Sequence, residues 1–286
     1  MPSDNRRARR FLQVDVFSDQ PTQGNGLAVV VDAEGLSTAQ MQAFAVWTNL
    51  AETTFLLPSE DPAADYRVRI FTPTKEMLFA GHPTLGSCMS WLHCGGTPRR
   101  AGVVVQDCAI GLVEIDVSGA EPAFVAPPTA IRPMKAAQRD RLQAAMQLYA
   151  AAVKQVICLD NGPKWDLFEL HSAAAVLAVD ASLVSSKEHN GLALIGAHPD
   201  GTECAYEVRN IAPSSGMIED PITGSLNAAI AHWLAAEGRL PAEMTVAQGT
   251  AIRRAGRVRY VRGAADPRQV LIGGAVNVLI DGQVTL

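Results

Sequence analysis

Three side chains in this sequence have types and settings suited to proton transfer and to binding a small anion. Glu52, in the stretch ETTFLL, is the one formally charged side chain between Gly35 and Ser59. His82 and Asp220 each precede a proline and a run of small uncharged residues, in GHPTLGS and EDPITGS. Partial burial of a carboxylate that has few charged neighbours raises its pKa toward a value useful for general acid–base catalysis.

Each of these residues also has a purely structural interpretation. Asp220 could cap a helix, which is worth about 0.5–2 kcal/mol. His82 could be a polar residue at the end of a loop, and Glu52 could be a solvated strand residue. Spacing alone does not bring Glu52 to the other two side chains. The functional interpretation gains weight because an internal repeat places His82 and Asp220 at matching positions.

The repeat consists of residues 65–92 and residues 205–234, offset by about half the chain. Each copy ends in an uncharged, helix-like stretch that carries a tryptophan. Two copies indicate two similar domains rather than a solenoid. After a two-residue difference in length the match resumes at a proline, and the matched pairs are Tyr66 with Tyr206, Val68 with Val208, Arg69 with Arg209, Pro73 with Pro213, Pro83 with Pro221, Gly86 with Gly224, Ser87 with Ser225 and Trp91 with Trp233.

The two helix-like stretches, HPTLGSCMSWLHC and DPITGSLNAAIAHWLAA, have no charged face. A helix that is apolar or small all round must be surrounded by protein, which in a strand-rich chain means a helix wrapped by strands. Pro83 and Pro221 suit the first helical turn. The sequence therefore predicts His82 and Asp220 at equivalent N-cap positions.

The predicted helix starts are suited to binding a carboxylate. A buried helix N-terminus presents unpaired N–H groups to an anion unless it is capped. Gly81 and Gly224 would let a ligand approach the backbone. We expect the two helix starts to meet at an interdomain cleft, which is a common kind of ligand site. A small carboxylate-bearing substrate fits these electrostatics, and no nucleotide-binding glycine loop is present.

Stretches rich in Val, Ile, Phe and Thr predict strands in FLQVDVF, GLAVVVD, TTFLL, YRVRIFT and AGVVVQ. Between the second and the third, STAQMQAFAVWTNL predicts a helix with Ser37 as N-cap and with Met41, Phe44, Ala45 and Leu50 on one face. We predict an α+β fold of two duplicated domains, residues 10–127 and 128–286. The last strand is a candidate for pairing back onto the first domain.

Composition excludes several function classes. The chain has 286 residues, 48% hydrophobic, with a net charge of −5, so no nucleic-acid partner or anionic membrane surface is indicated. The basic run Arg6–Arg10 is expected to be a solvated N-terminal arm. Five scattered cysteines favour reduced thiols in a cytoplasmic protein. No membrane span and no metal-binding motif is predicted.

Five stretches together resemble the phenazine-biosynthesis PhzF-like family over nearly the whole chain: VDVFSDQPTQGNGLAVV, NLAETTFL, FAGHPTLGS, RNIAPSSGMIEDPITGSLNAA and IGGAVNVLIDGQVTL. The resemblance implies a fold shared with diaminopimelate epimerase, in which each half is a β-barrel-like sheet around a central helix. It also implies a homodimeric isomerase that uses neither cofactor nor metal. The family's named activity is that of trans-2,3-dihydro-3-hydroxyanthranilate isomerase.

The resemblance implies a role for each candidate residue. Glu52 would take a proton from one carbon of the substrate and return it to another. His82 and Asp220 would hold polar groups of the substrate. N–H or hydroxyl contacts to the substrate carboxylate would come from Gly81, Gly224 and Ser225.

The sequence departs from the family pattern at Ala51, where serine is common, and at Gly26, where proline is common. Loss of the serine removes a hydrogen bond to the substrate. This change affects the identity of the expected substrate more than the type of reaction. Related epimerases use two cysteines at the helix starts, where this chain has His82 and Asp220, so two-thiol racemisation is disfavoured. Two alternatives stay open: a protein that binds a metabolite or a protein partner without catalysis, and an epimerase with one base.

Overall fold

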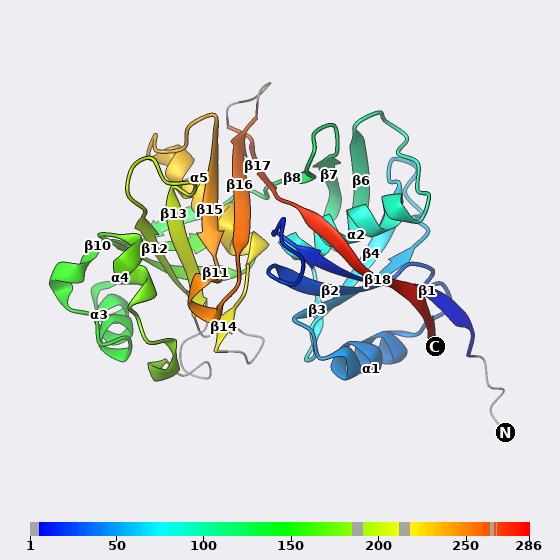
Figure 1. Ribbon diagram of the computed structural model, residues 1–286, viewed down its shortest axis with the longest axis horizontal. Helices are drawn as coiled ribbons and strands as arrows, with labels where there is room; N and C mark the ends of the chain where they lie inside the picture. The colour runs from blue at the N-terminus through cyan, green and yellow to red at the C-terminus, as the bar shows by residue number, and fades with distance from the viewer. Residues whose placement is uncertain (1–5, 185–190, 212–217, 264–265, 267) are drawn as a thin grey trace. The chain divides into compact units, whose positions relative to one another are not determined.

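The computed structural model describes residues 6–184, 191–211, 218–263, 266 and 268–286. The chain forms two compact units, one of Met1–Phe124 with Ala275–Leu286 and the other of Val125–Gly274 (Figure 1). The division falls between Phe124 and Val125, whereas the sequence predicted it after residue 127. Of the predicted repeat matches, Pro213 lies outside the described residues.

The first unit is a mixed sheet whose neighbouring strands, in order, are β18, β1, β2, β3, β4, β6, β7 and β8. β2 pairs with β3 and β4 with β6 in parallel, and the other neighbours are antiparallel. The short β5 pairs with β4. The bounds are β1 Ala8–Val16, β2 Asn25–Val30, β3 Glu52–Leu57, β4 Tyr66–Phe71, β5 Glu76–Met77, β6 Val103–Cys108, β7 Gly111–Asp116, β8 Ala123–Val125 and β18 Val276–Thr285.

The second unit repeats this pattern in the order β9, β10, β11, β12, β13, β15, β16 and β17, with β14 on β13. Parallel pairs again join β11 to β12 and β13 to β15. Along the chain, the edge strand of each sheet comes directly after the last strand of the other unit: β9 follows β8, and β18 follows β17. The bounds are β9 Ala130–Pro133, β10 Val153–Asp160, β11 Lys164–Leu170, β12 Leu192–Ala197, β13 Tyr206–Ile211, β14 Glu219–Asp220, β15 Glu243–Gln248, β16 Gly256–Arg262 and β17 Val270–Gly273.

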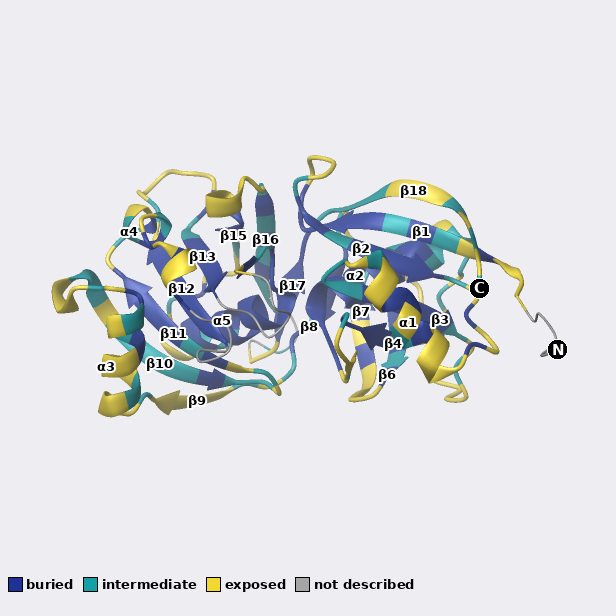
Figure 2. Cartoon of the chain, turned by 90° about the horizontal axis from the view of Figure 1, so that it is seen from below, coloured by how far each residue is buried: buried dark blue, intermediate teal, exposed yellow. Residues whose placement is uncertain are grey.

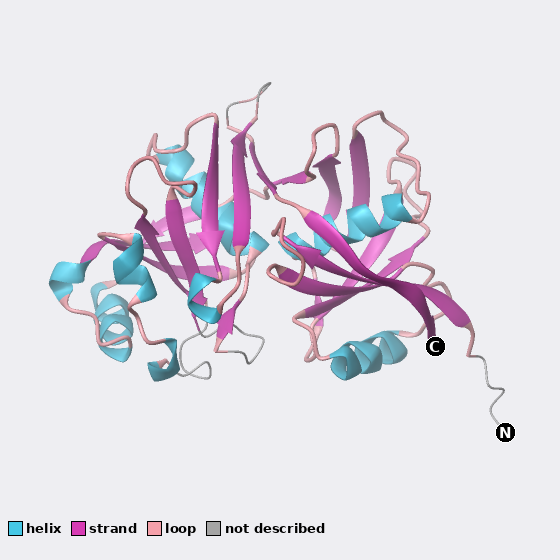
Figure 3. Ribbon diagram, in the orientation of Figure 1, coloured by secondary structure: helices cyan, strands magenta, loops and turns pink. Residues whose placement is uncertain are grey.

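A central helix runs along each sheet, α2 (Gly81–His93) in the first unit and α5 (Gly224–Ala236) in the second (Figure 3). Most of their residues are buried, as expected for helices without a charged face. At Gly86 an added Cβ would lie 2.6 Å from Leu27 and 3.1 Å from Val14 and Val16. Glycine there lets α2 pack directly against β1 and β2.

The outer face of each sheet is covered by further helices. In the first unit α1 (Thr38–Thr48) buries Met41, Phe44 and Ala45 against Phe55 and Phe71 and exposes its other side (Figure 2). Ser37 and Gln40 form the capping box that fixes its start, so the predicted N-cap is confirmed. In the second unit the covering helices are α3 (Ala136–Ala145) and α4 (Ala173–Leu177).

The structure corrects the register of the repeat. β4 and β13 align at Tyr66 and Tyr206, as predicted. The two central helices, each 13 residues long, instead align at Gly81 and Gly224, so the equivalent of His82 is Ser225. The matches of Pro83, Gly86, Ser87 and Trp91 with residues 221, 224, 225 and 233 are therefore wrong.

Two features at the helix ends support the corrected register. Each helix is followed by a glycine with positive φ, Gly95 and Gly238, and the hydrogen bond that Gly96 makes to Trp91 is repeated by Arg239 and Leu234. The short strands β5 and β14 lie equally far before their helices, but the stretch between β13 and β14 is three residues longer than the stretch between β4 and β5, and this difference displaced the sequence match.

The basic run at the N-terminus is not a solvated arm throughout. β1 begins at Ala8, and strand alternation turns Arg9 inward, where it is 4% exposed. Its guanidinium donates to the carbonyl oxygens of Asp32 and Glu34 at 2.7 and 2.9 Å. The other arginines of the run are exposed.

The same Arg–Glu ion pair occurs in both units, buried in the second and more exposed in the first, so its two copies should contribute differently to stability. Arg209 donates to both oxygens of Glu219 at 3.0 and 2.7 Å, with side chains 3% and 1% exposed. In the first unit Arg69 and Glu76 make the same bidentate pair at 19% and 39% exposure. We expect the Glu219→Gln substitution to lower the free energy of unfolding by about 3–5 kcal/mol, because it leaves a buried charge uncompensated.

The Glu76→Gln substitution is the control and should cost about 0–1 kcal/mol, since the pair is solvated. Urea denaturation of the two variants measures the difference. Equal losses would show that burial does not set the strength of the Arg209–Glu219 pair.

Candidate functional site

Glu52 and His82 lie together in the first unit. Oε2 of Glu52 is 3.4 Å from Nε2 of His82, and the side chains are 17% and 4% exposed. Glu52 is the first residue of β3, and His82 is the second residue of α2 rather than its N-cap, which is Ala80. The prediction of an N-cap histidine is therefore wrong, but its ring faces the carboxylate that the sequence analysis selected.

Strand alternation explains why Glu52 points to α2. Side chains two apart on a strand share a face, and Thr54 faces α2 because Ser87 donates to its hydroxyl at 2.9 Å. Phe55 takes the opposite face and packs against Phe44 of α1. Glu52 is therefore directed to the α2 side, at the end of the strand nearest the start of that helix.

The imidazole of His82 is neutral at physiological pH. Burial lowers the pKa of His82 from 6.5 to about 3. The side-chain amide of Asn25 lies 3.4 Å from Nδ1. With Asn25 as donor, the single ring proton sits on Nε2 and faces Glu52. The contact with Glu52 is then that of a neutral N–H with a carboxylate and not an ion pair, and it is long for a hydrogen bond.

Asp220 belongs to the second unit and ends β14, four positions before α5 begins at Gly224. It is therefore not at an N-cap, and Pro221 lies before the helix rather than in its first turn. The N-cap is Thr223, whose hydroxyl donates to Oδ2 of Asp220 over 2.5 Å. Neither the equivalence of Asp220 with His82 nor its predicted capping position holds, because the helix starts later than the proline suggests.

Both central helices begin without a side-chain cap. Ala80 has no polar side chain, and Thr223 makes no side-chain hydrogen bond to the first turn of α5. The first helical residues are Gly81 in α2 and Gly224 in α5, followed in α5 by Ser225, and all three are buried. No side-chain cap thus uses the first-turn N–H groups of these helices, and binding of an anion there stays a prediction.

The structure brings Glu52, His82 and Gly81 together in one unit, and Asp220, Gly224 and Ser225 in the other. Sequence reasoning missed Asn25, Thr223, Asn227 and Gln248, which hold these residues. Asn25 and Thr223 lie inside the motifs QGNG and EDPITGS. Asn227 lies in the quoted stretch DPITGSLNAA, although nothing there marks its role, and Gln248 carries no sequence signal because its partners come from other elements.

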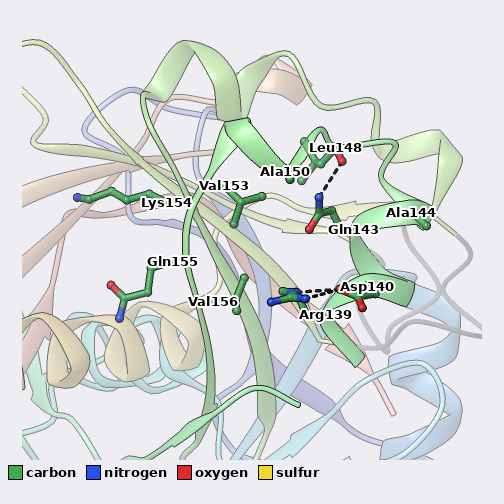
Figure 4. Close-up of a pocket in the computed structure, with 10 residues that line it drawn as sticks. All are labelled: Arg139, Asp140, Gln143, Ala144, Leu148, Ala150, Val153, Lys154, Gln155 and Val156. Carbon is green, nitrogen blue, oxygen red and sulfur yellow. Dashed lines mark hydrogen bonds and ion pairs between the residues drawn. The ribbon is translucent and has the colours of Figure 1, made fainter. Parts of the chain in front are cut away.

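A cavity of about 590 Å³ lies in the second unit, beside α3 and β10 (Figure 4). None of the candidate residues named above lines it. Its cationic side chains are paired, Arg139 with Asp140 at 2.7 Å and Lys154 with Glu169 at 2.8 Å. These pairs leave little net charge to attract a carboxylate, so we assign the cavity no part in the site.

Comparisons with known proteins identify the family of this chain. The model of the family described as phenazine biosynthesis-like protein matches residues 14–282. A Schizosaccharomyces pombe protein named antisense-enhancing sequence 1 is 31% identical, over 96% of this chain and 97% of its own length. The trans-2,3-dihydro-3-hydroxyanthranilate isomerase of Pseudomonas aeruginosa is 30% identical, over 88% of this chain and 90% of its own. Other relatives are named uncharacterised isomerases.

Solved structures confirm the predicted fold. The PhzF-family phenazine biosynthesis protein of Bacillus anthracis matches with a TM-score of 0.81 at 22% identity, over 98% of this chain and all of that one. A hydroxyproline epimerase from Agrobacterium vitis matches with a TM-score of 0.63 at 13% identity, over 98% and 93%. No helix in the described part of the chain is long and apolar enough to cross a membrane.

Because the family model matches residues 14–282, the chain belongs to the phenazine biosynthesis-like, or PhzF, family of isomerases.

Proposed function

We propose that this protein moves a proton within a small carboxylate-bearing substrate, as a trans-2,3-dihydro-3-hydroxyanthranilate isomerase does, with Glu52 as the proton shuttle. The observation that carries the proposal is the pairing of Glu52 with a histidine that is neutral at pH 7. Because the pKa of His82 is about 3, its ring does not accept a second proton near neutral pH. Of the two side chains, Glu52 is then the one able to take up a proton and release it.

In this mechanism the substrate carboxylate accepts hydrogen bonds from the N–H groups of Gly81, Gly224 and Ser225. His82 and Asp220 bind an amino or hydroxyl group and orient the ring. Glu52 removes a proton from an activated carbon, and the electron pair left behind is delocalised through the conjugated system. Glu52 then delivers a proton to a second carbon on the same face, and exchange of its carboxyl group with solvent before delivery is what introduces deuterium when the reaction runs in D₂O. General acid–base catalysis of this kind contributes about 10²–10⁴-fold, and placement in a closed site adds to it.

The proposal is tested in D₂O with trans-2,3-dihydro-3-hydroxyanthranilate and with a panel of other cyclic and amino carboxylates. NMR should show deuterium at one carbon of a substrate, together with movement of its double bond. Exchange with inversion at a single centre, without movement of a double bond, would favour the one-base epimerase instead.

A second candidate function is binding without catalysis. The name of the fission yeast relative, antisense-enhancing sequence 1, does not describe an enzyme. A protein of this class would bind a carboxylate from the panel and leave its carbon-bound hydrogens unexchanged. Calorimetric titration beside the exchange experiment separates the two candidates.

Assembly and compartment complete the proposal. We expect a homodimer, in keeping with the family resemblance and with the frequency of two-fold dimers among soluble oligomers. Light scattering coupled to gel filtration measures this directly. The five cysteines are free thiols, which fits a reducing compartment such as the cytoplasm.

A further inference from the structure

The threonine at the start of α5 uses its hydroxyl in an unusual way. An N-cap hydroxyl ordinarily accepts a hydrogen bond from a backbone N–H of the first helical turn. Thr223 is the N-cap residue of α5, and its side chain makes no such bond. Its Oγ1 lies instead 2.5 Å from Oδ2 of Asp220.

Two buried amides fill the acceptor positions of this hydroxyl. Nδ2 of Asn210 donates to Oγ1 of Thr223 over 3.0 Å, and Nε2 of Gln248 donates to it over 3.1 Å. A hydroxyl has one proton and two lone pairs, and an ionised carboxylate can only accept. With both lone pairs occupied, the hydroxyl proton is directed to Asp220.

The orientation of the Gln248 amide is fixed by its own partners. Its Oε1 accepts from the backbone N–H of Thr223 over 3.1 Å and from Nδ2 of Asn227 over 2.7 Å. Its Nε2 therefore faces Oγ1 of Thr223 and the carbonyl oxygen of Asp220. Asn227 is held in turn by the buried hydroxyl of Tyr260 at 2.6 Å. The Gln248 amide is held in one orientation, because both its oxygen and its nitrogen are engaged in the buried network.

We propose that Thr223 is a positioning residue, which holds the Asp220 carboxylate in one orientation for the substrate while leaving the first turn of α5 uncapped for the substrate carboxylate. This inference rests on the proposed function of Asp220 and adds a residue to it. The corresponding N-cap of α2 is Ala80, which has no hydroxyl. Both central helices therefore begin without a side-chain cap: Ala80 has no hydroxyl, and the hydroxyl of Thr223 bonds to Asp220.

The test compares Thr223→Val, which removes the hydroxyl at nearly constant shape, with Thr223→Ser, which keeps it. The probe is 2-aminobenzoate, an unreactive ring that carries a carboxylate and an amino group, and calorimetry measures its Kd. A hydrogen bond to a charged group corresponds to a factor of roughly 10–100, so we expect the valine variant to bind that much more weakly. The serine variant should stay within about 2-fold of the unmodified protein, because it can still donate to Asp220.

A double-mutant cycle with Asp220→Ala separates positioning from simple structural support. If Thr223 acts through Asp220, the valine substitution causes no further loss of binding once Asp220 is absent. The proposal is overturned if the valine variant binds like the unmodified protein, or if the two losses multiply. Binding that is lost equally in the valine and serine variants would also overturn it.

The four proteins of this cycle are compared by their urea midpoints: the unmodified protein, Thr223→Val, Asp220→Ala and the double variant. If the unmodified protein neither binds 2-aminobenzoate nor exchanges deuterium, the proposed function is refuted. The urea midpoints then still test whether Thr223 holds Asp220. The double variant should shift the midpoint by less than the sum of the single shifts. Additive shifts would show that Thr223 does not hold Asp220.

Discussion

The Glu52→Gln variant is expected to lose deuterium incorporation into substrate by about 10²–10⁴-fold, which is the range that a general base contributes. Glutamine has nearly the shape of glutamate but cannot take up a proton from carbon. Because Glu52 lies at the start of β3, beside the ring of His82, the amide can keep the contact with Nε2. Binding of 2-aminobenzoate should therefore stay close to that of the unmodified protein.

The control is Glu60→Gln, an exposed glutamate beyond the end of β3, which should exchange at the normal rate. Parallel loss of exchange and binding in the Glu52 variant would indicate a role in binding alone. A fully active variant would remove Glu52 from the mechanism and leave the base unassigned.

A second large effect is expected in acid. The pKa of His82 lies at about 3 in the folded protein and at the ordinary 6.5 in the unfolded chain. Between these values the unfolded chain binds a proton that the folded protein does not, so stability falls as the pH is lowered. At about 1.4 kcal/mol per pH unit, the total loss between pH 6.5 and pH 3 is on the order of 4–5 kcal/mol. The His82→Gln variant should lack this part of the pH dependence.

Urea denaturation at several pH values measures the slope for each protein. His171→Gln, which replaces an exposed histidine, is the matched control and should retain the slope of the unmodified protein. Equal slopes for His82→Gln and the unmodified protein would contradict the account. They would show that the negative charge of Glu52 compensates for the burial of the imidazole.

Much of the fold could be predicted because its signals are local. The strands YRVRIF and YEVRNI occupy β4 and β13 in the predicted register, and the charge-free stretches form the two central helices. The helix starts were misplaced for a physical reason. Prediction of a start depends on a capping side chain, but Ala80 has none and the hydroxyl of Thr223 bonds to Asp220.

The candidate site was predictable only in part. Glu52 is recognisable from the absence of other charges around it, and the motifs around His82 and Asp220 carry the family resemblance. The contact of Glu52 with His82 joins a strand to a helix 30 positions later, which no spacing rule predicts. Asn25 and Gln248 were missed for the same reason, since their roles depend on the partners that the fold brings to them.

A crystal structure with 2-aminobenzoate bound tests the proposal that Glu52 is the base. Glu52 is expected to face a ring carbon of the ligand, with Nε2 of His82 within about 3.2 Å of one of the ligand's polar groups. A ligand bound away from these residues, with Glu52 directed into bulk solvent, would contradict it.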